Sequence, residues 1–362
     1  YQQNCRINFA HRTFQWNSDA RGKAAVHCVI IGFAYKQRSE KFIFDYETPV
    51  SEPHALKANN INPYLVDGPD LVLARRNKPL CDVPEIGIGN KPIDDGNYLF
   101  KPEEKEEFLR LEPAAAPYFR RWIGSDEFIN NIERWCLWLG DCPPNVLKKM
   151  PHAMERVQAV KKFRLASKSA PTRKIAETPT RFHVENMPKG NSLVIPEVSS
   201  ERRVYIPLGY VGPEILCSNK VRLFQDATLF HFGVLQSTMH MAWTRAVCGR
   251  LENRYQYSIN IVYNNFPWPE ATEKQQAAVE KAAQAVLDAR ARFADCSLAD
   301  LYDPLAMPPE LLKAHHALDR AVDAAYGRSG FKSEAERVAY LFELYQKISS
   351  PLLPPAPRKK KK

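Results

Sequence analysis

The sequence predicts an α+β protein, in which an irregular β core with flanking helices is followed by a small C-terminal helical bundle. Short β-rich runs separated by Gly, Pro and Asn fill residues 178–265. After Pro267 the chain changes to segments with helical spacing and recognisable caps. A chain of 362 residues is too long for one small core and suits two or three packed units.

The composition is that of an ordinary globular protein. Hydrophobic residues make up 44% and charged residues 25% of the chain, so disorder is not expected. The longest apolar run, Ala24 to Ala34, has the length of a strand and is too short to span a membrane. The first residues, Tyr1 to Arg6, show neither a signal-peptide pattern nor an initiator Met. We therefore expect a cytoplasmic protein and a sequence cut from a longer chain.

The N-terminal part predicts a β-hairpin over residues 7–35. Residues 7–16 alternate apolar and mostly polar side chains, residues 17–22 form a polar turn, and residues 24–33 are nearly all apolar. Such an apolar run is typical of a strand in the middle of a sheet that is covered on both faces. The region from about 36 to 100 is rich in Pro, Asn and Asp and predicts a connection with short elements.

Three helices are predicted next by apolar spacing, over residues 102–111, 126–139 and 150–166. The second would place one face inward, capped by Ser125 or Asp126, and that face consists of Phe128, Ile132, Trp135 and Leu139. The third would bury Met154, Val157, Val160 and Phe163.

Five short strands are predicted in the β-rich region, at 193–195, 204–206, 221–224, 228–234 and 255–262. Three capped helices follow. Thr272 with Gln275 starts the first, which runs to about Phe293; Pro308-Pro309 opens the second, which stops at Gly327; and Ser333 with Glu336 starts the third, which ends before Ser349.

Sequence motifs for catalysis are weak. Gly87-Ile88-Gly89 lacks the third glycine and the setting of a dinucleotide loop and is expected to be a turn. Asn62-Pro63-Tyr64 lacks the second proline of the Asn-Pro-Pro-aromatic loop of amino-methyltransferases. Asp94-Asp95 precedes Gly96, as is common in turns. His315 and His316 point about 100° apart on a helix and cannot chelate one ion together.

The cysteines also argue against a metal site. All eight are expected to be free thiols in a reducing compartment, because they show no C-x-x-C and no paired Cys/His spacing; they are residues 5, 28, 81, 136, 142, 217, 248 and 296.

Positive charge is concentrated in one segment. The net charge is +10, of which Arg358 to Lys362 contribute five charges. Residues 148–174, which we call the basic segment, contain nine Lys or Arg and one acid, Glu155. Two interpretations remain open for this segment, a solvated surface and a set of phosphate contacts that position a protein on DNA. The candidate phosphate contacts are Lys148, Lys149, Lys161, Lys162 and Arg164, together with Arg245 and Arg250 further along the chain.

A second polar feature lies in the segment from Arg245 to Tyr257. If residues 252–257 are extended, Glu252 and Arg254 project from the same face, because side chains alternate along a strand. Arg can donate to guanine O6 and N7, and Glu can accept from cytosine N4, so the two could read one G·C pair. The alternative is a surface ion pair worth under about 1 kcal/mol.

Eight motifs spread over most of the chain resemble one known family. They are Ile86–Tyr98, Phe119–Ile129, Arg134–Leu139, Met239–Trp243, Cys248–Leu251, Tyr263–Pro269, Tyr302–Pro308 and Leu318–Val322. Their order and spacing resemble the C-terminal half of the MmeI-like (type IIL) restriction-modification enzymes and their methylase relatives. The hairpin over residues 7–35 looks like the last strands of that family's methyltransferase domain.

The resemblance implies a DNA target-recognition domain and a helical C-terminal segment attached to an adenine-N6 methyltransferase that uses S-adenosylmethionine. Base flipping and methylation would belong to a part of the enzyme that precedes this sequence, as would any nuclease domain. Neither the cofactor glycine loop nor the complete Asn-Pro-Pro-aromatic motif is found in the sequence. We therefore expect this part alone to bind no cofactor and to catalyse no reaction.

Carried over by position, the family's base-reading residues would include Glu252 and Arg254, with Asn219 and Lys220 as a second pair.

The expected partners are duplex DNA and the methyltransferase domain of the same protein. Two alternative functions remain open, a regulatory subunit that docks on a methyltransferase with little DNA contact, and a free-standing enzyme. The expected division is a terminal methyltransferase hairpin, a recognition domain, a helical segment and a basic disordered tail, at residues 1–40, 41–270, 271–350 and 351–362.

Overall fold

The structure is a computed structural model that describes residues 5–16, 26–46, 48, 50–328 and 330–350. The chain divides into two compact units, each built from more than one segment. The first unit contains residues 1–83, 237–279 and 317–362, and the second contains residues 84–236 and 280–316. The predicted turn at 17–22 and the predicted tail at 351–362 lie outside the described residues. Within the described ranges, no helix is both long enough and apolar enough to cross a membrane.

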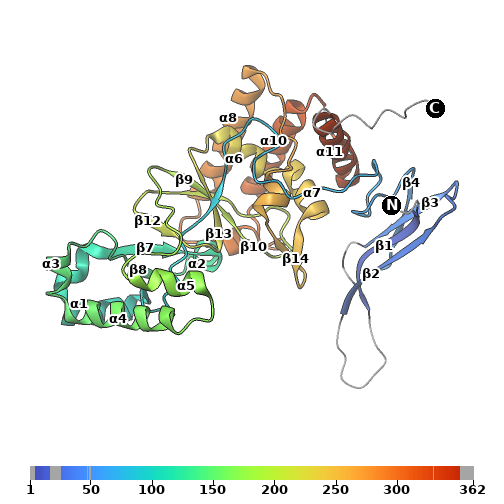
Figure 1. Cartoon of the computed structure of the whole chain (residues 1–362). Coiled ribbons are helices and arrows are strands. Elements are labelled where there is room, and N and C mark those ends of the chain that lie inside the picture. The colour runs from blue at the N-terminus through green and yellow to red at the C-terminus, as the bar shows by residue number, and fades with distance from the viewer. Residues whose placement is uncertain (1–4, 17–25, 47, 49, 329, 351–362) are drawn as a thin grey trace, which may run out of the picture. The chain divides into compact units, whose positions relative to one another are not determined.

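The first unit contains a four-stranded sheet of order β2-β1-β3-β4 (Figure 1). Its strands are β1 (Arg6–Trp16), β2 (Val26–Ala34), β3 (Lys41–Asp45) and β4 (His54–Ala58). Strand β1 pairs antiparallel with β2, so the predicted hairpin is confirmed. It pairs parallel with β3, which in turn pairs antiparallel with β4.

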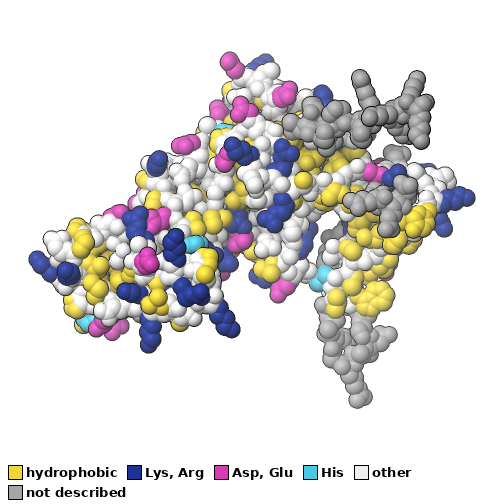
Figure 2. Space-filling view, viewed as in Figure 1, with side chains coloured by type: hydrophobic (Ala, Val, Ile, Leu, Met, Phe, Trp, Pro, Cys, Tyr) yellow, Lys and Arg dark blue, Asp and Glu magenta, His cyan; other side chains and the backbone are white. Residues whose placement is uncertain are grey.

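The expected position of the apolar strand is wrong for the described residues. Strand β2 lies at the edge of its sheet, not at its centre. Its apolar side chains are largely exposed, and Phe33 keeps 67% of its surface accessible. Figure 2 shows hydrophobic side chains gathered over this sheet. The apolar pattern therefore indicates a surface suited to burial that the described residues leave uncovered.

The rest of the first unit is built on a helix pair. Helix α7 (Thr238–Val247) packs on α11 (Glu334–Ser349). The Trp243 ring lies 5.4 Å from Phe342 and 6.1 Å from Tyr345 between ring centroids, and all three side chains are buried. After α7 come the short strands β14 (Gly249–Leu251) and β15 (Arg254–Gln256) and a π-helical turn (Ile259–Tyr263).

The second unit contains two four-stranded sheets, of orders β12-β7-β8-β6 and β11-β9-β13-β5. The first consists of β12 (Ile215–Cys217), β7 (Phe119–Ile123), β8 (Trp135–Leu137) and β6 (Leu99–Phe100). The second consists of β11 (Gly209–Val211), β9 (Ser192–Pro196), β13 (Val221–Gln225) and β5 (Gly87–Ile88). The unit also contains the short strand β10 (Val198–Ser199). A mixed fold of short strands with flanking helices confirms the predicted class.

The second unit also contains helices, several of which form a core with the first of these sheets. They are α1 (Pro102–Leu111), α2 (Ser125–Asn130), α3 (Pro144–Leu147), α4 (Pro151–Leu165), α5 (Ala170–Lys174) and α6 (Leu229–Leu235), with 3-10 turns at Pro113–Tyr118 and Ile175–Glu177. The buried rings of Phe100, Phe108 and Phe119 meet edge to face in the centre of this core. Helices α1 and α4 lie side by side in Figure 1 and both contribute to that core.

The predicted helix over 126–139 is wrong in its second half. Helix α2 ends where Asn131 adopts a left-handed conformation with φ of 53°, and residues 135–137 form strand β8. The helix predicted over 150–166 is confirmed as α4, but its inward face differs. Arg164 is buried, whereas the neighbouring Phe163 is exposed.

The β-rich region is confirmed only in part. The strands predicted at 193–195 and 221–224 are β9 and β13. Residues 228–234 instead form helix α6, because Thr228 caps it by accepting the main-chain N–H of His231. A short apolar run does not distinguish a buried strand from a buried helix by its periodicity.

The other two predicted strands are wrong for a different reason. Around 204–206 a side chain replaces the sheet partner, since the Gln236 side chain donates to the carbonyl of Ile206 at 3.0 Å. In the segment 255–262 the strand β15 ends at Gln256. The indole of Trp243 then donates to the carbonyl of Val262 at 2.9 Å.

The C-terminal helices follow their predicted caps. They are α8 (Glu273–Ala291), the short α9 (Leu298–Leu301), α10 (Pro309–Ala325) and α11. Thr272 Oγ1 accepts the N–H of Gln275, and Ser333 Oγ accepts the N–H of Glu336. Gly327 ends the second predicted helix with a φ of 76°, which favours glycine.

Candidate nucleic-acid interface

Strands β14 and β15 form an exposed hairpin over residues 249–256, which we call the reading hairpin. Gly249 pairs with Gln256 and Leu251 with Arg254, so Glu252 and Asn253 form a two-residue turn. Glu252 has a φ of 57°, in the left-handed region. The expectation that residues 252–257 are extended is therefore wrong at its first two residues, because Glu252 and Asn253 form the turn and the strand begins at Arg254.

The turn nevertheless brings the two predicted base-reading side chains together. Arg254 Nη2 lies 2.9 Å from Glu252 Oε2, and both side chains are exposed. An exposed guanidinium with an adjacent carboxylate presents donors and an acceptor side by side, which is the arrangement that the edge of a G·C pair accepts in the major groove. Whether the pair reads bases stays a prediction.

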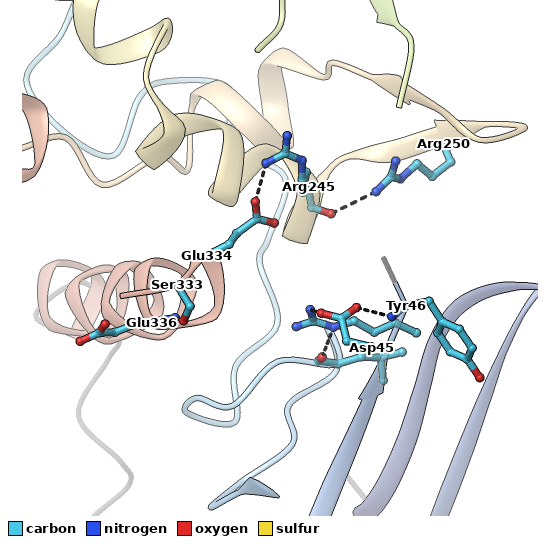
Figure 3. Close-up of polar contacts among 9 residues, drawn as sticks. Asp45, Tyr46, Arg245, Arg250, Ser333, Glu334 and Glu336 are labelled. Carbon is cyan, nitrogen blue, oxygen red and sulfur yellow. Dashed lines mark hydrogen bonds and ion pairs between the residues drawn. The ribbon is translucent and has the colours of Figure 1, made fainter. Parts of the chain in front are cut away.

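Arg245 and Arg250 are both engaged within the protein. Arg245, at the end of α7, is bonded to the carboxylate of Glu334, and its Nε donates to the hydroxyl of Tyr255 at 3.2 Å. Burial by itself lowers the pKa of Arg245, but Glu334 and Tyr255 outweigh it and raise that pKa above the usual value. Arg250 donates to the carbonyls of Asn253 and Arg245, as Figure 3 shows for the second.

Arg250 also stacks on an aromatic ring. Its guanidinium carbon lies 4.2 Å from the ring centroid of Tyr255. The tip of the reading hairpin has a further contact, because the side chains of Asn253 and His27 approach to 3.1 Å. The cations near the reading hairpin thus stabilise its conformation, and their prediction as phosphate contacts stays untested.

The second predicted pair, Asn219 and Lys220, lies in the tight turn between β12 and β13. The main-chain N–H of Asn219 donates to the carbonyl of Asn90 at 2.8 Å, and Lys220 Nζ lies 3.9 Å from Glu197 Oε2. The main-chain contact fixes the backbone of this turn. The side chain of Lys220 is 69% exposed, so its amine remains accessible.

Sequence reasoning missed two residues beside this turn. The nearly buried Arg222 donates from Nη2 to Glu197 Oε1 at 2.8 Å, and Ser125 Oγ accepts the N–H of Glu197 at 3.1 Å. Glu197 and Arg222 are 25 positions apart. No local spacing signals such a contact, so only knowledge of the β9–β13 pairing could have found it.

The lysines of the basic segment face solvent. Lys148 and Lys149 follow α3, Lys161 and Lys162 lie near the C-terminal end of α4, and all four are exposed. In Figure 2 Lys and Arg side chains are spread over the part of the surface formed by α4 and α5. Exposed lysines on long flexible stems are suited to phosphates but carry no base preference.

The prediction that Arg164 contacts phosphate is wrong. Its side chain is fully buried, and its guanidinium donates to five carbonyl oxygens, those of Pro92, Ile93, Ile175, Thr178 and Arg181. A guanidinium has five N–H donors in a rigid fork, and here they are used to join the end of α4 to two loops. Arg164 therefore supports the fold and does not face DNA.

The motifs judged weak have structural roles in the described residues. Asn62 Oδ1 accepts the main-chain N–H of Tyr64 at 2.9 Å, and Asp94 accepts that of Tyr98 at 2.8 Å, as in turns. The buried His315 contacts the hydroxyl of Tyr302 at 2.8 Å. The expectation of a turn at Gly87-Ile88 is wrong, because these residues form β5. A side chain at Gly89 would lie 2.3 Å from the carbonyl oxygen of Ser218.

The eight cysteines occupy different environments. All are free; Cys136, Cys142 and Cys217 are buried, and Cys296 is exposed. Burial raises the pKa of Cys217 to about 12, so this thiol stays protonated and unreactive. Among the described residues, no group of three or more His, Cys, Asp or Glu side chains is placed to hold a metal ion.

Comparison with known proteins gives a consistent result. A family model described as the target recognition domain of MmeI matches residues 67–270. Models of the MmeI C-terminal domain and the MmeI DNA-methyltransferase domain match residues 271–353 and 1–45.

Two relatives extend this similarity. DNA methyltransferase A of Bacillus subtilis (strain 168) is 39% identical over 345 residues, which is 95% of this chain and 38% of that protein. The solved structure of the type IIL restriction-modification enzyme MmeI in complex with DNA is 50% identical, with a TM-score of 0.90 over 96% of this chain and 47% of that one. The chain thus spans less than half the length of these two relatives.

Proposed function

Because this chain belongs to the MmeI family, we propose that it binds duplex DNA and selects the site for an S-adenosylmethionine-dependent adenine-N6 methyltransferase of a restriction-modification system. The observation that carries the proposal is the exposed Glu252–Arg254 pair at the tip of the reading hairpin, inside the region that matches a target recognition domain. The similar MmeI structure was solved in complex with DNA, which supports DNA as the ligand.

The proposed interface combines two kinds of contact. Glu252 and Arg254 read one base pair, and the turn at Asn219 and Lys220 supplies a second reading pair. The exposed lysines at 148, 149, 161 and 162 contact phosphates and hold the protein on any sequence. Of the net charge of +10, the five charges that lie outside the run Arg358 to Lys362 favour a polyanionic partner. Arg245 and Arg250 contribute to the proposed base reading mainly through the conformation of the reading hairpin.

The second proposed partner is a methyltransferase domain of the same polypeptide, in the cytoplasm. Support comes from residues 1–45, which match a methyltransferase model and contain strands β1, β2 and β3 of the four-stranded sheet. Its edge strand β2 exposes Val26, Val29 and Phe33, side chains that proteins bury where they can. We propose the division stated above, with residues 1–40 as the end of that domain, 41–270 as the recognition domain, 271–350 as a helical segment and 351–362 as a basic tail.

We further propose that these residues alone neither bind S-adenosylmethionine nor transfer a methyl group. In the one partial match to a catalytic motif, Asn62 is fully buried and its side-chain oxygen Oδ1 accepts the N–H of Tyr64, so it is not placed to hold a flipped base. The glycine loop that would hold the cofactor is likewise not found in the sequence. Calorimetry with the 362-residue chain tests this, and stoichiometric cofactor binding with a micromolar constant would contradict it.

The test of DNA binding uses the full-length protein and measures its affinity for duplex DNA at increasing salt. If phosphate contacts hold the complex, the logarithm of the binding constant falls linearly with the logarithm of salt concentration. A protein that associates with a methyltransferase but shows no salt-dependent duplex binding would be a docking subunit, and the proposal would be wrong.

A further inference from the structure

The reading hairpin is too short to hold its shape alone. Each strand has three residues, and Glu252 at its turn adopts a left-handed conformation that an L-residue disfavours. An isolated two-stranded hairpin is marginally stable in water even when it is longer. Since base recognition requires side chains held within a fraction of an ångström, something outside the hairpin must fix it.

One cluster in the first unit supplies this support, and we call it the anchor: Arg245, Tyr255 and Glu334. The guanidinium of Arg245 lies between the other two members and is bonded to both. Tyr255 is the buried middle residue of β15, directly next to Arg254. Figure 3 shows Glu334 reaching Arg245 from the first turn of helix α11. The anchor thus joins α7, the reading hairpin and α11.

Helix α11 is itself rigidly placed. Its first turn is capped by Ser333, whose hydroxyl accepts the N–H of Glu336 at 3.2 Å. Its buried face packs on α7 through Phe342 and Tyr345. Glu334 is therefore held by a packed helix and not by a loop, so it can fix the position of Arg245.

We propose that Arg245, Tyr255 and Glu334 are positioning residues for base recognition, through which the C-terminal helix α11 sets the geometry of Glu252 and Arg254 without touching DNA. Arg250 completes the arrangement, because it stacks on Tyr255 and donates to the carbonyl of Arg245. This inference rests on the proposed function of the reading hairpin. It assigns to the C-terminal segment a part in choosing the DNA sequence.

The experiment compares variants of the full-length protein by mapping its methylated sites across a genome. Glu334→Gln keeps the shape of the side chain and removes its charge, and Tyr255→Phe removes only the hydroxyl. Both should relax discrimination about tenfold at one position of the recognised sequence, within the range of a lost bidentate contact. That position should be the one that Glu252→Gln with Arg254→Ala relaxes, and all other positions should keep their preference.

The matched control is Arg337→Gln on the same helix. Arg337 is paired with the buried Asp323 of α10 at 2.7 Å and does not belong to the anchor. This variant should lower the unfolding temperature at least as much as Glu334→Gln and leave the recognised sequence unchanged. If Arg337→Gln relaxes the same position equally, or if neither anchor variant relaxes it, the inference is wrong.

A structural measurement gives a second readout that needs no DNA. In Glu334→Gln the amide protons of residues 249–256 should exchange with solvent faster than in the unmodified protein, whereas Arg337→Gln should leave them unchanged. Unchanged exchange in Glu334→Gln would overturn the anchor. A different outcome concerns the proposed function: if Glu252→Gln with Arg254→Ala leaves the recognised sequence intact, base reading by the hairpin fails, whatever the anchor variants do.

Discussion

The reading hairpin and the basic segment both contain cations that the sequence assigns to DNA, but the structure holds these cations differently. In and beside the hairpin, Arg245, Arg250 and Arg254 are each bonded to a neighbouring carboxylate or carbonyl. In the basic segment, the exposed lysines extend into solvent, and Arg164 is turned inward. The structure shows one of these cations, Arg164, supporting the fold, whereas base reading by Arg254 and phosphate attraction by the lysines are proposed roles.

A count of charges does not show how each cation is held, and this determines what the cation can contribute to DNA binding. An arginine in a fixed geometry can discriminate between bases, because its donors are already aimed. A lysine on a flexible stem contributes to binding at every sequence alike. The two regions should therefore fail in different ways when they are changed, and each of the following measurements separates one of these purposes from the others.

The largest effect is expected at Arg164. Replacing it with Ala leaves five carbonyl oxygens without their donor, each worth about 1–3 kcal/mol when buried. Since some of these oxygens can reach water, we expect a loss of more than about 4 kcal/mol in the free energy of unfolding, measured by denaturant titration. Lys161→Ala, three residues away on the same helix, should change it by less than about 0.5 kcal/mol. If the two substitutions lower the free energy of unfolding equally, Arg164 does not support the fold in the way described.

The next effect concerns sequence preference. Glu252→Gln with Arg254→Ala in the full-length enzyme should lower discrimination at one position of the recognised sequence by about 1–3 kcal/mol, because a bidentate contact to one base pair is lost. Overall affinity should change little, since the proposed phosphate contacts lie elsewhere. Genome-wide mapping of methylated sites measures the change. If the recognised DNA sequence and the activity are both unchanged, Glu252 and Arg254 form only a surface ion pair and do not read bases.

A smaller and more uniform effect is expected in the basic segment. Replacing Lys148, Lys149, Lys161 and Lys162 with Ala should weaken binding to all duplexes alike. The slope of log K against log salt should flatten by about 0.9 for each phosphate contact that is lost. Lys274→Ala with Lys281→Ala on α8 also removes positive charge and serves as the control. If the control flattens the slope equally per charge, the effect comes from net charge and the basic segment is a solvated surface.

The secondary structure shows which elements could be predicted from the sequence. The C-terminal helices were predicted closely, because Thr272, Ser333 and Gly327 mark their ends by local chemistry. Strands β9 and β13 were predicted as well, whereas α6 was taken for a strand. Seven residues are too few for periodicity to distinguish a helix from a strand. The predicted strand therefore begins at Thr228, which in the structure caps the helix.

In the candidate site, too, local contacts could be predicted from the sequence and long-range contacts could not. The i, i+2 spacing of Glu252 and Arg254 indicated that the side chains meet, although a turn brings them together and not a strand. The inward direction of Arg164 could not be predicted, because its five acceptors come from loops far apart in the chain. Glu334 and Tyr255 were missed for that reason too. Contacts between distant segments follow from the fold and not from local pattern.

The smallest predicted effect isolates the strain in the turn of the reading hairpin. At φ of 57°, Glu252 has a conformation that costs an L-residue about 1–2 kcal/mol and costs glycine little. Glu252→Gly and Glu252→Ala both remove the carboxylate, so their difference in unfolding free energy reports the backbone alone. We expect Gly to be more stable than Ala by about 1 kcal/mol in thermal unfolding. At Lys161 on helix α4 the same pair should reverse, with Gly less stable by about 1 kcal/mol. If Ala is as stable as Gly at position 252, the turn is unstrained. If the reversal holds, the protein keeps a strained residue where a relaxed one was available, as expected where a side chain is retained for recognition and not for stability.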